Sequence, residues 1–149
     1  MPMTVQEILD DKGSLGGRTH GTSPEAPMSE AVATMVREDI GSVVVLEGDC
    51  LVGILTRREV VKGLENLGAR LLQVKVREVM NPVPAVVHPE DSADGLRSTM
   101  TELHLSHVPV MKDKRIVGII SFHDIARSAI KDVAFENKLL KQYIKNWPQ

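Results

Sequence analysis

The chain repeats itself at a fixed offset of 65 residues, and this repeat limits the possible folds more than any other feature of the sequence. Pro24 and Gly53 recur as Pro89 and Gly118, and the same offset brings the alternating valines of the two copies into register without a gap. Internal repeats of this kind fold as similar units that bury their apolar faces against one another. We therefore expect two units of one design in a single protein.

Each copy has the same order of predicted elements. A proline opens a helix at its first turn, where its missing N–H costs nothing, and apolar residues from Met28 to Met35 then recur at helical spacing. Two short apolar runs, Ser42–Leu46 and Leu51–Leu55, flank a glycine-containing turn, which predicts a hairpin. A second helix begins near Arg58. With a leading strand, the order is β-α-β-β-α in each copy, which predicts a mixed α/β (α+β) fold.

The repeat divides the chain into a first copy, a second copy and a C-terminal amphipathic helix: residues 1–73, 74–127 and 128–149. A short apolar segment precedes each copy, Val5–Leu9 and Val76–Met80. The first copy has six more residues after this segment, within Asp10–Thr22. We expect these residues to form a loop where a ligand approaches.

Composition argues against several classes of function. The net charge of −2 provides no electrostatic footprint for nucleic acid. No apolar run reaches the roughly 18 residues of a membrane span, and the N-terminus has no basic region followed by an apolar stretch. The single cysteine, Cys50, excludes an intramolecular disulfide and fits a reducing compartment. We expect a cytoplasmic protein that binds neither nucleic acid nor membranes.

The motifs of the two copies resemble those of the CBS (cystathionine beta-synthase) domain family. These motifs are Val76-Arg77-Glu78-Val79-Met80-Asn81-Pro82, His107-Val108-Pro109-Val110, residues 118–125 and their first-copy counterpart 53–60. Their tandem arrangement is similar to a free-standing Bateman module. The resemblance implies two halves packed sheet to sheet about a pseudo-twofold axis, with two clefts between them. It also implies adenosine-containing ligands such as AMP, ADP, ATP, NAD(H) or S-adenosylmethionine, with AMP or NAD(H) favoured, and no catalytic cofactor.

Ser121 and Asp124 form the main candidate site of the second copy, together with Phe122 and His123 between them. One carboxylate can accept hydrogen bonds from both hydroxyls of a ribose, and a serine with the N–H groups of a helix start can bind phosphate. The alternative is a capping box in which Ser121 and Asp124 only close the helix end. The repeat and the family pattern favour the ligand.

The corresponding residues of the first copy are Thr56, Arg57, Arg58 and Glu59. Thr56 matches the hydroxyl position of the family, whereas Glu59 stands where the family usually has aspartate. Guanidinium groups suit phosphate recognition. We expect Arg58 to contribute more to phosphate binding than Arg57.

A third candidate region surrounds Gly21 and Val86, which occupy the positions where the family often has threonine. Thr22 lies one residue late, and His20 precedes this segment. His107 is expected to line a cleft. A metal site would need three or four converging ligands, and we expect none.

The sequence contains no motif of a catalytic nucleophile, phosphate loop or dinucleotide fingerprint. We therefore expect a regulatory binding module and not an enzyme. The alternative is a structural interaction module whose degenerate clefts bind no ligand. In either case the regulated protein is not indicated.

The tail carries a heptad pattern consisting of Ile130, Val133, Asn137, Leu140, Ile144 and Trp147. A buried asparagine at a core position can fix the register and number of paired helices. The pattern predicts a homodimer to which this helix contributes. The alternative is a helix folded back on its own subunit.

Overall fold

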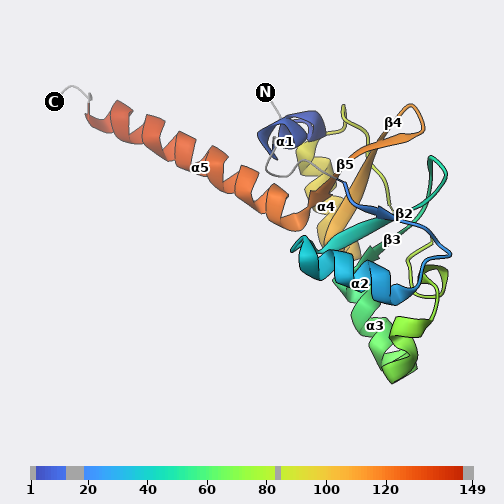
Figure 1. Ribbon diagram of the computed structural model, residues 1–149. Helices are drawn as coiled ribbons and strands as arrows, with labels where there is room; N and C mark the ends of the chain where they lie inside the picture. Colours follow the sequence, from blue (N-terminus) through green and yellow to red (C-terminus); the bar gives the residue numbers. More distant parts are fainter. Residues whose placement is uncertain (1–2, 13–18, 83–84, 146–149) are drawn as a thin grey trace.

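The computed structural model describes residues 3–12, 19–82 and 85–145, in which two similar halves lie side by side and one long helix projects from them (Figure 1). The central residues of the loop expected within Asp10–Thr22 lie outside this range. The first copy contains β1 (Gly21–Thr22), α2 (Met28–Arg37), β2 (Ser42–Glu47), β3 (Cys50–Thr56) and α3 (Arg57–Leu67). The second contains α4 (Ala93–Leu103), β4 (His107–Lys112), β5 (Arg115–Ser121) and α5 (Phe122–Lys145).

The strands of the two hairpins pair at equivalent positions, which agrees with the predicted mixed α/β fold. Val43 pairs with Leu55 in the antiparallel hairpin β2–β3, and the equivalent Val108 pairs with Ile120 in β4–β5. The leading strand β1 pairs in parallel with β2. In the second copy this strand is reduced to a parallel bridge between Val87 and Val110.

The apolar segments ahead of the two copies form helical turns. Val5–Lys12 is the helix α1, and two 3-10 helices, η2 (Gly68–Gln73) and η3 (Val76–Glu78), precede the second copy. Apolar spacing over so few residues fits a helix turn as well as a strand, so the pattern alone did not determine their conformation.

Each leading segment packs into the core of the other copy. Val5 and Ile8 of α1 are fully buried with Val108 and Ile120 of the second copy. Val76 of η3 is fully buried in the first copy's core, in the cluster that also contains the residues Met28, Val43 and Leu55. Backbone hydrogen bonds hold both exchanges, from Val5 N–H to Asp91 O at 2.9 Å and from Val76 N–H to Ala26 O at 2.8 Å. The two copies therefore complete each other's cores.

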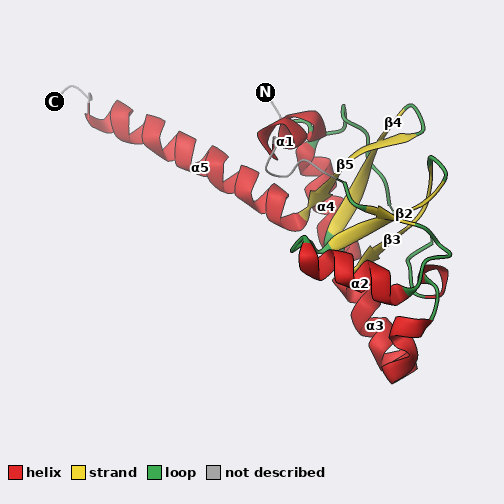
Figure 2. Cartoon of the chain, in the orientation of Figure 1, coloured by secondary structure: helices red, strands yellow, loops and turns green. Residues whose placement is uncertain are grey.

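Helices surround the paired sheets. α2 and α3 pack on the first sheet, and α1, α4 and the first turns of α5 gather around the second (Figure 2). Strand β3 packs against its counterpart β5, which brings the sheets of the two copies together. No helix in the described part of the chain combines the length and the apolar character that a bilayer crossing requires.

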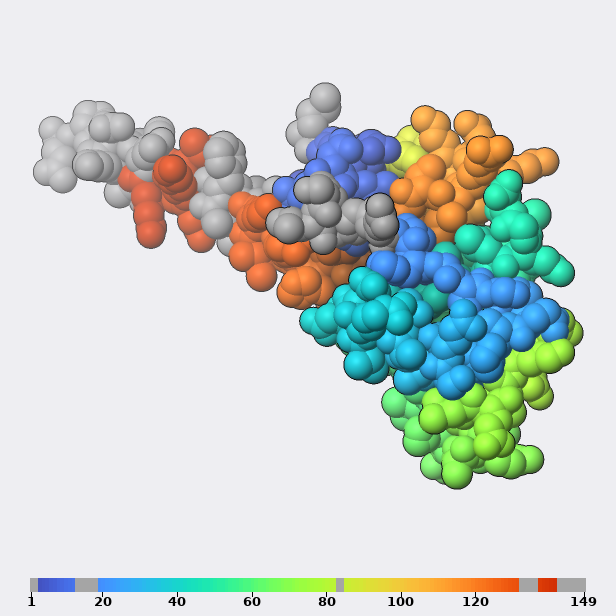
Figure 3. Space-filling view, viewed as in Figure 1, coloured from blue at the N-terminus to red at the C-terminus, as the bar shows by residue number. Residues whose placement is uncertain are grey.

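Helix α5 continues without interruption through residue 128, where the sequence predicts that a separate helix begins. Figure 1 shows it projecting away from the two halves, and its coloured part in Figure 3 also lies beyond the body, which does not agree with a tail folded back on its own subunit. Ile130 and Leu140 are 68% and 58% exposed. Asn137 is also exposed, the side chains of Val133 and Ile144 are not described, and Trp147 lies outside the described residues.

Candidate ligand-binding site

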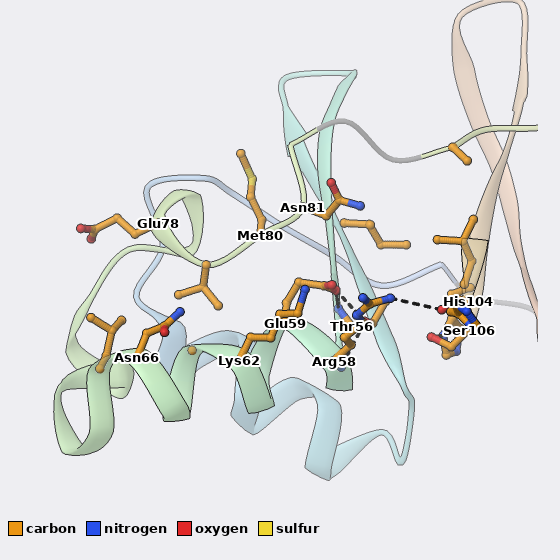
Figure 4. A pocket seen from close by; sticks show the side chains of 17 residues that line it. Thr56, Arg58, Glu59, Lys62, Asn66, Glu78, Met80, Asn81, His104 and Ser106 are labelled. Atoms are coloured by element: carbon orange, nitrogen blue, oxygen red, sulfur yellow. Dashed lines mark hydrogen bonds between the residues drawn. The ribbon is translucent and has the colours of Figure 1, made fainter. Parts of the chain in front are cut away.

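A cavity of about 650 Å³ lies between the two copies. Three parts of the fold line it: the end of β3 with α3, the segment around η3, and the loop between α4 and β4 (Figure 4). The polar residues of its wall are Thr56, Arg58, Glu59, Lys62, Asn66, Glu78, Asn81, His104, Ser106 and His107. The apolar part includes Ile54, Val79 and Met80. A volume of this size is within the range of pockets that bind small molecules.

Thr56 and Glu59 form a capping box at the start of α3. The Glu59 Oε1 atom accepts hydrogen bonds from the Thr56 N–H at 2.7 Å and from its hydroxyl at 2.5 Å. The Thr56 hydroxyl in turn accepts from the Arg58 N–H at 3.2 Å. This arrangement satisfies the free N–H groups of the helix start and fixes the Glu59 carboxylate at the cavity wall.

Two cationic side chains follow along the same side of α3. Arg58 donates from Nη1 to the backbone oxygen of His104 at 3.3 Å and so joins α3 to the end of α4 (Figure 4). Lys62 lies one helical turn further on and forms no ion pair with any described residue. Both groups can therefore meet an anionic part of a ligand.

His107 stands at the boundary between the copies and is neutral at pH 7. Burial, with the charges of Arg57 and Lys12, lowers its pKa to about 4, although the charge of Asp124 acts in the opposite direction. Its Nδ1 atom lies 2.9 Å from the Ser106 hydroxyl. A neutral imidazole beside Arg57 adds hydrogen-bonding capacity without adding repulsion.

The candidate residues of the second copy are already engaged. The Asp124 N–H donates to the Ser121 hydroxyl at 3.0 Å, and Asp124 Oδ2 accepts from the Ser121 N–H at 2.8 Å. The same oxygen lies 2.9 Å from Lys12 Nζ, and Oδ1 lies 3.1 Å from an Arg127 nitrogen. Burial opposes ionisation, but the hydrogen bond from the Ser121 backbone and the contact with Lys12 lower the pKa of Asp124 below its ordinary value.

The remaining predicted residues do not line the cavity. Gly21 and Thr22 pair with Val44 and Val45 in the sheet, and His20 Nε2 lies 3.9 Å from a Glu38 oxygen. The Phe122 N–H donates to Ser106 O at 2.8 Å. The side chains of Val86, Phe122 and His123 are exposed, and Arg57 lies against His107 at Gly41. The structure therefore gathers Thr56, Arg58, Glu59 and His107 around one cavity and leaves Ser121 and Asp124 in another place.

Sequence reasoning missed Lys62 and Asn66 in the cavity wall. Both follow Arg58 at intervals of four residues, so a helical projection of α3 from Arg58 would have found them. It also missed Asn81, although the motif 76–82 contains it. Lys12 had no such signal, because its contacts with the second copy join residues more than 100 positions apart.

Comparisons with known proteins agree with this architecture. The sequence matches the CBS domain family over residues 22–66 and 76–131. The mitochondrial CBS domain-containing protein CBSX3 of Arabidopsis thaliana is 27% identical over 148 residues, which cover 95% of this chain and 72% of that protein.

Two solved structures show the same fold. The CBS-domain protein ATU1752 from Agrobacterium tumefaciens superposes with a TM-score of 0.80 at 31% identity, covering 85% of this chain and 99% of that one. The CBS domain pair of protein MJ0100, in complex with 5-methylthioadenosine and S-adenosylmethionine, superposes with a TM-score of 0.75 at 23% identity, covering 89% of this chain and 99% of that one. With its two repeats, its exchanged leading segments and these matches, the chain belongs to the CBS domain family as a tandem pair.

Proposed function

We propose that this protein is a regulatory module that senses an adenine nucleotide, AMP, ADP, ATP or NAD(H), in the cavity beside α3. The observation that carries this proposal is the cavity itself, where a fixed carboxylate, two cations and an apolar wall face one space. The CBS pair of MJ0100 holds adenosine-containing ligands, which supports the same class of ligand here.

The wall offers a partner for each part of such a ligand. Ile54 and Met80 supply apolar surface for the faces of an adenine ring. The Glu59 carboxylate can accept hydrogen bonds from ribose hydroxyls, and hydrogen bonds to a charged acceptor are the stronger kind. Arg58 and Lys62 supply positive charge for phosphate groups. These residues bind and orient a ligand, and we assign no catalytic step to them.

The experiment that tests this function is a thermal-shift panel with AMP, ADP, ATP, NAD, NADH, S-adenosylmethionine and 5-methylthioadenosine. A ligand that binds only the folded state at 100 times its Kd adds about 2.7 kcal/mol of stability and raises Tm. Inosine monophosphate and guanosine monophosphate are the controls for adenine recognition. An unchanged Tm with every adenine compound would favour the second candidate.

The second candidate is a structural interaction module with non-binding clefts. One observation favours it: Ser121 and Asp124, the residues that best match the family pattern, use their hydrogen-bonding groups within the protein. This candidate predicts that partner proteins, and not nucleotides, raise Tm. The exposed thiol of Cys50 fits a reducing compartment such as the cytoplasm for either candidate.

We also propose that the module is a homodimer to which α5 contributes. The helix projects from the body, and Ile130 and Leu140 of the heptad pattern are exposed on it. Exposed apolar side chains along one seam of a long helix are typical of an interface. A second copy would bring an identical face, which a twofold interface requires.

A further inference from the structure

Lys12 reaches from the end of α1 into the second copy and holds the carboxylate that the sequence assigns to ribose. Its Nζ atom lies 2.9 Å from Asp124 Oδ2 and donates to the backbone oxygen of Ile119 at 2.7 Å. The side chains of Lys12 and Asp124 are only 17% and 6% exposed. This is a partly buried, well-formed ion pair, and not a surface contact of negligible strength.

The repeat identifies the place that Lys12 occupies. In the first copy, Ile54, Thr56 and Glu59 line the open cavity. The offset of 65 residues carries these three positions onto Ile119, Ser121 and Asp124. Two of the three second-copy residues, Ile119 and Asp124, are the ones that Lys12 contacts. Its ammonium group therefore stands where the first copy has ligand space.

The leading segments explain this difference between the copies. Met80 lies against Gly53 in the first copy, and Leu9 lies against Gly118 in the second. Beyond Leu9 the helix α1 continues to Lys12, whereas η3 ends at Glu78. Asp11 lies next to Lys12, and both of its carboxylate oxygens accept hydrogen bonds from Lys131 Nζ of α5 at 3.0 Å. These bonds anchor the end of α1 in this position.

We propose that Lys12 is an internal occupant of the second cleft, which closes that cleft to adenine ligands and limits the protein to one ligand per chain. This proposal rests on the proposed function. The hydroxyls of a ribose are neutral donors, and they must replace an ammonium ion that already neutralises a buried carboxylate. Displacing Lys12 removes one of the two cations that contact the Asp124 carboxylate and leaves Arg127 alone, at 3.1 Å, so the displacement costs free energy.

The test counts bound ligands on the full chain by isothermal titration with AMP and, separately, with S-adenosylmethionine. The Lys12→Met variant keeps an unbranched apolar chain but removes the ammonium. We expect one site per chain in the natural protein and two in Lys12→Met. The affinity of the second cleft should rise at least about tenfold relative to the natural protein, because Asp124 Oδ2 no longer contacts the ammonium group. The matched control, Lys112→Met at the exposed end of β4, keeps one site.

A double variant, Lys12→Met with Asp124→Asn, assigns the new site. Asparagine still accepts the hydrogen bond from the Ser121 N–H but lacks the negative charge, so the second site is expected to disappear again. If the natural protein binds two ligands, or if the natural protein and Lys12→Met each bind one, the proposed role of Lys12 is wrong. Either result leaves the proposed function intact. A site seen only in Lys12→Met supports that role but moves the proposed function to the second cleft. If neither protein binds either compound, the proposed function fails and the role of Lys12 fails with it.

Discussion

At the scale of single residues, the two copies use the same helix cap with different consequences. Thr56 with Glu59 and Ser121 with Asp124 both form reciprocal hydrogen bonds at a helix start. The extra methylene of Glu59 does not prevent this cap. What differs is the surroundings: the Asp124 carboxylate faces Lys12, and the Glu59 carboxylate faces a cavity.

The two adjacent arginines of the first copy provide a matched pair for testing phosphate recognition. Arg58 lines the cavity, whereas Arg57 lies against His107 and Gly41. We expect Arg58→Ala to weaken AMP binding by about 1.5–3 kcal/mol, the range for a hydrogen bond to a charged group, and to leave adenosine binding nearly unchanged. Arg57→Ala should change neither by more than about 0.5 kcal/mol. Titration calorimetry measures all four affinities, and equal losses for AMP and adenosine would show that Arg58 supports the fold instead.

His107 predicts a specific pH dependence of stability. Its pKa is lowered to about 4 in the folded protein, so between pH 6.5 and 4 the unfolded chain takes up a proton that the folded chain excludes. The free energy of unfolding must then fall as the pH decreases through this range. We expect a loss of about 1–3 kcal/mol from this group.

Urea denaturation at pH 7 and pH 4.5 measures that loss. The His107→Asn variant, which retains a polar side chain next to Ser106, should lose less stability over the same interval. Equal losses in the two proteins would show that His107 does not carry the effect.

At the scale of elements, the close approach of each leading segment to a strand depends on one glycine. A Cβ atom at Gly53 would lie 2.6 Å from the Met80 sulfur and 2.8 Å from the backbone oxygen of Asn81. That oxygen is held by the Ile54 N–H at 3.0 Å. The three atoms nearest to a Cβ atom at Gly118 would all belong to the side chain of Leu9, the first at 2.8 Å.

We therefore expect Gly53→Ala to destabilise the protein by about 1–3 kcal/mol, the usual cost of overpacking. Gly118→Ala should cost less, because the end of a leucine side chain can move and a hydrogen-bonded backbone cannot. Chemical denaturation of the two variants compares them directly. A larger loss for Gly118→Ala would contradict the rigid contact at Asn81.

The hairpins and the first-copy site could be predicted because their signals are local. The expected runs Ser42–Leu46 and Leu51–Leu55 differ by one residue at some ends from β2 and β3, and the motif 53–60 contains four cavity residues. The exchange of leading segments could not be predicted, because periodicity indicates that Val5 and Val76 are buried but not in which core. The contact of Lys12 with Asp124 depends on that exchange, so it was hidden as well.

At the scale of the whole molecule, the exchange predicts that damage at the N-terminus appears in the second copy. Removal of residues 1–12 deletes Val5 and Ile8, which are fully buried in the second core, at about 1.5–3 kcal/mol for each side chain. Hydrogen exchange should then show lost amide protection in β4 and β5, and smaller losses in β2 and β3. Greater loss in β2 and β3 would contradict the exchange.

The proposed dimer predicts a change of mass on truncation. A chain ending at Lys131 retains the part of α5 that packs on the body, including Ile125, and loses the projecting part with Leu139 and Leu140. Sedimentation should then report a monomer, and circular dichroism should show the loss of only the helical signal of the removed residues. A dimer that survives this truncation would place the interface elsewhere on the body.

The crossing of the leading segments also bears on how such a chain arose. A single repeat with this topology has a vacant place in its core, and its own leading segment projects toward a neighbour. It could be completed only by a second, identical chain that donates the same segment in return. A duplication within one gene would join such a pair in one chain and free the two halves to diverge. Glu59 and its counterpart Asp124 differ in length by one methylene, and α1 continues to Lys12 whereas η3 ends at Glu78. These are differences of the kind that this freedom permits.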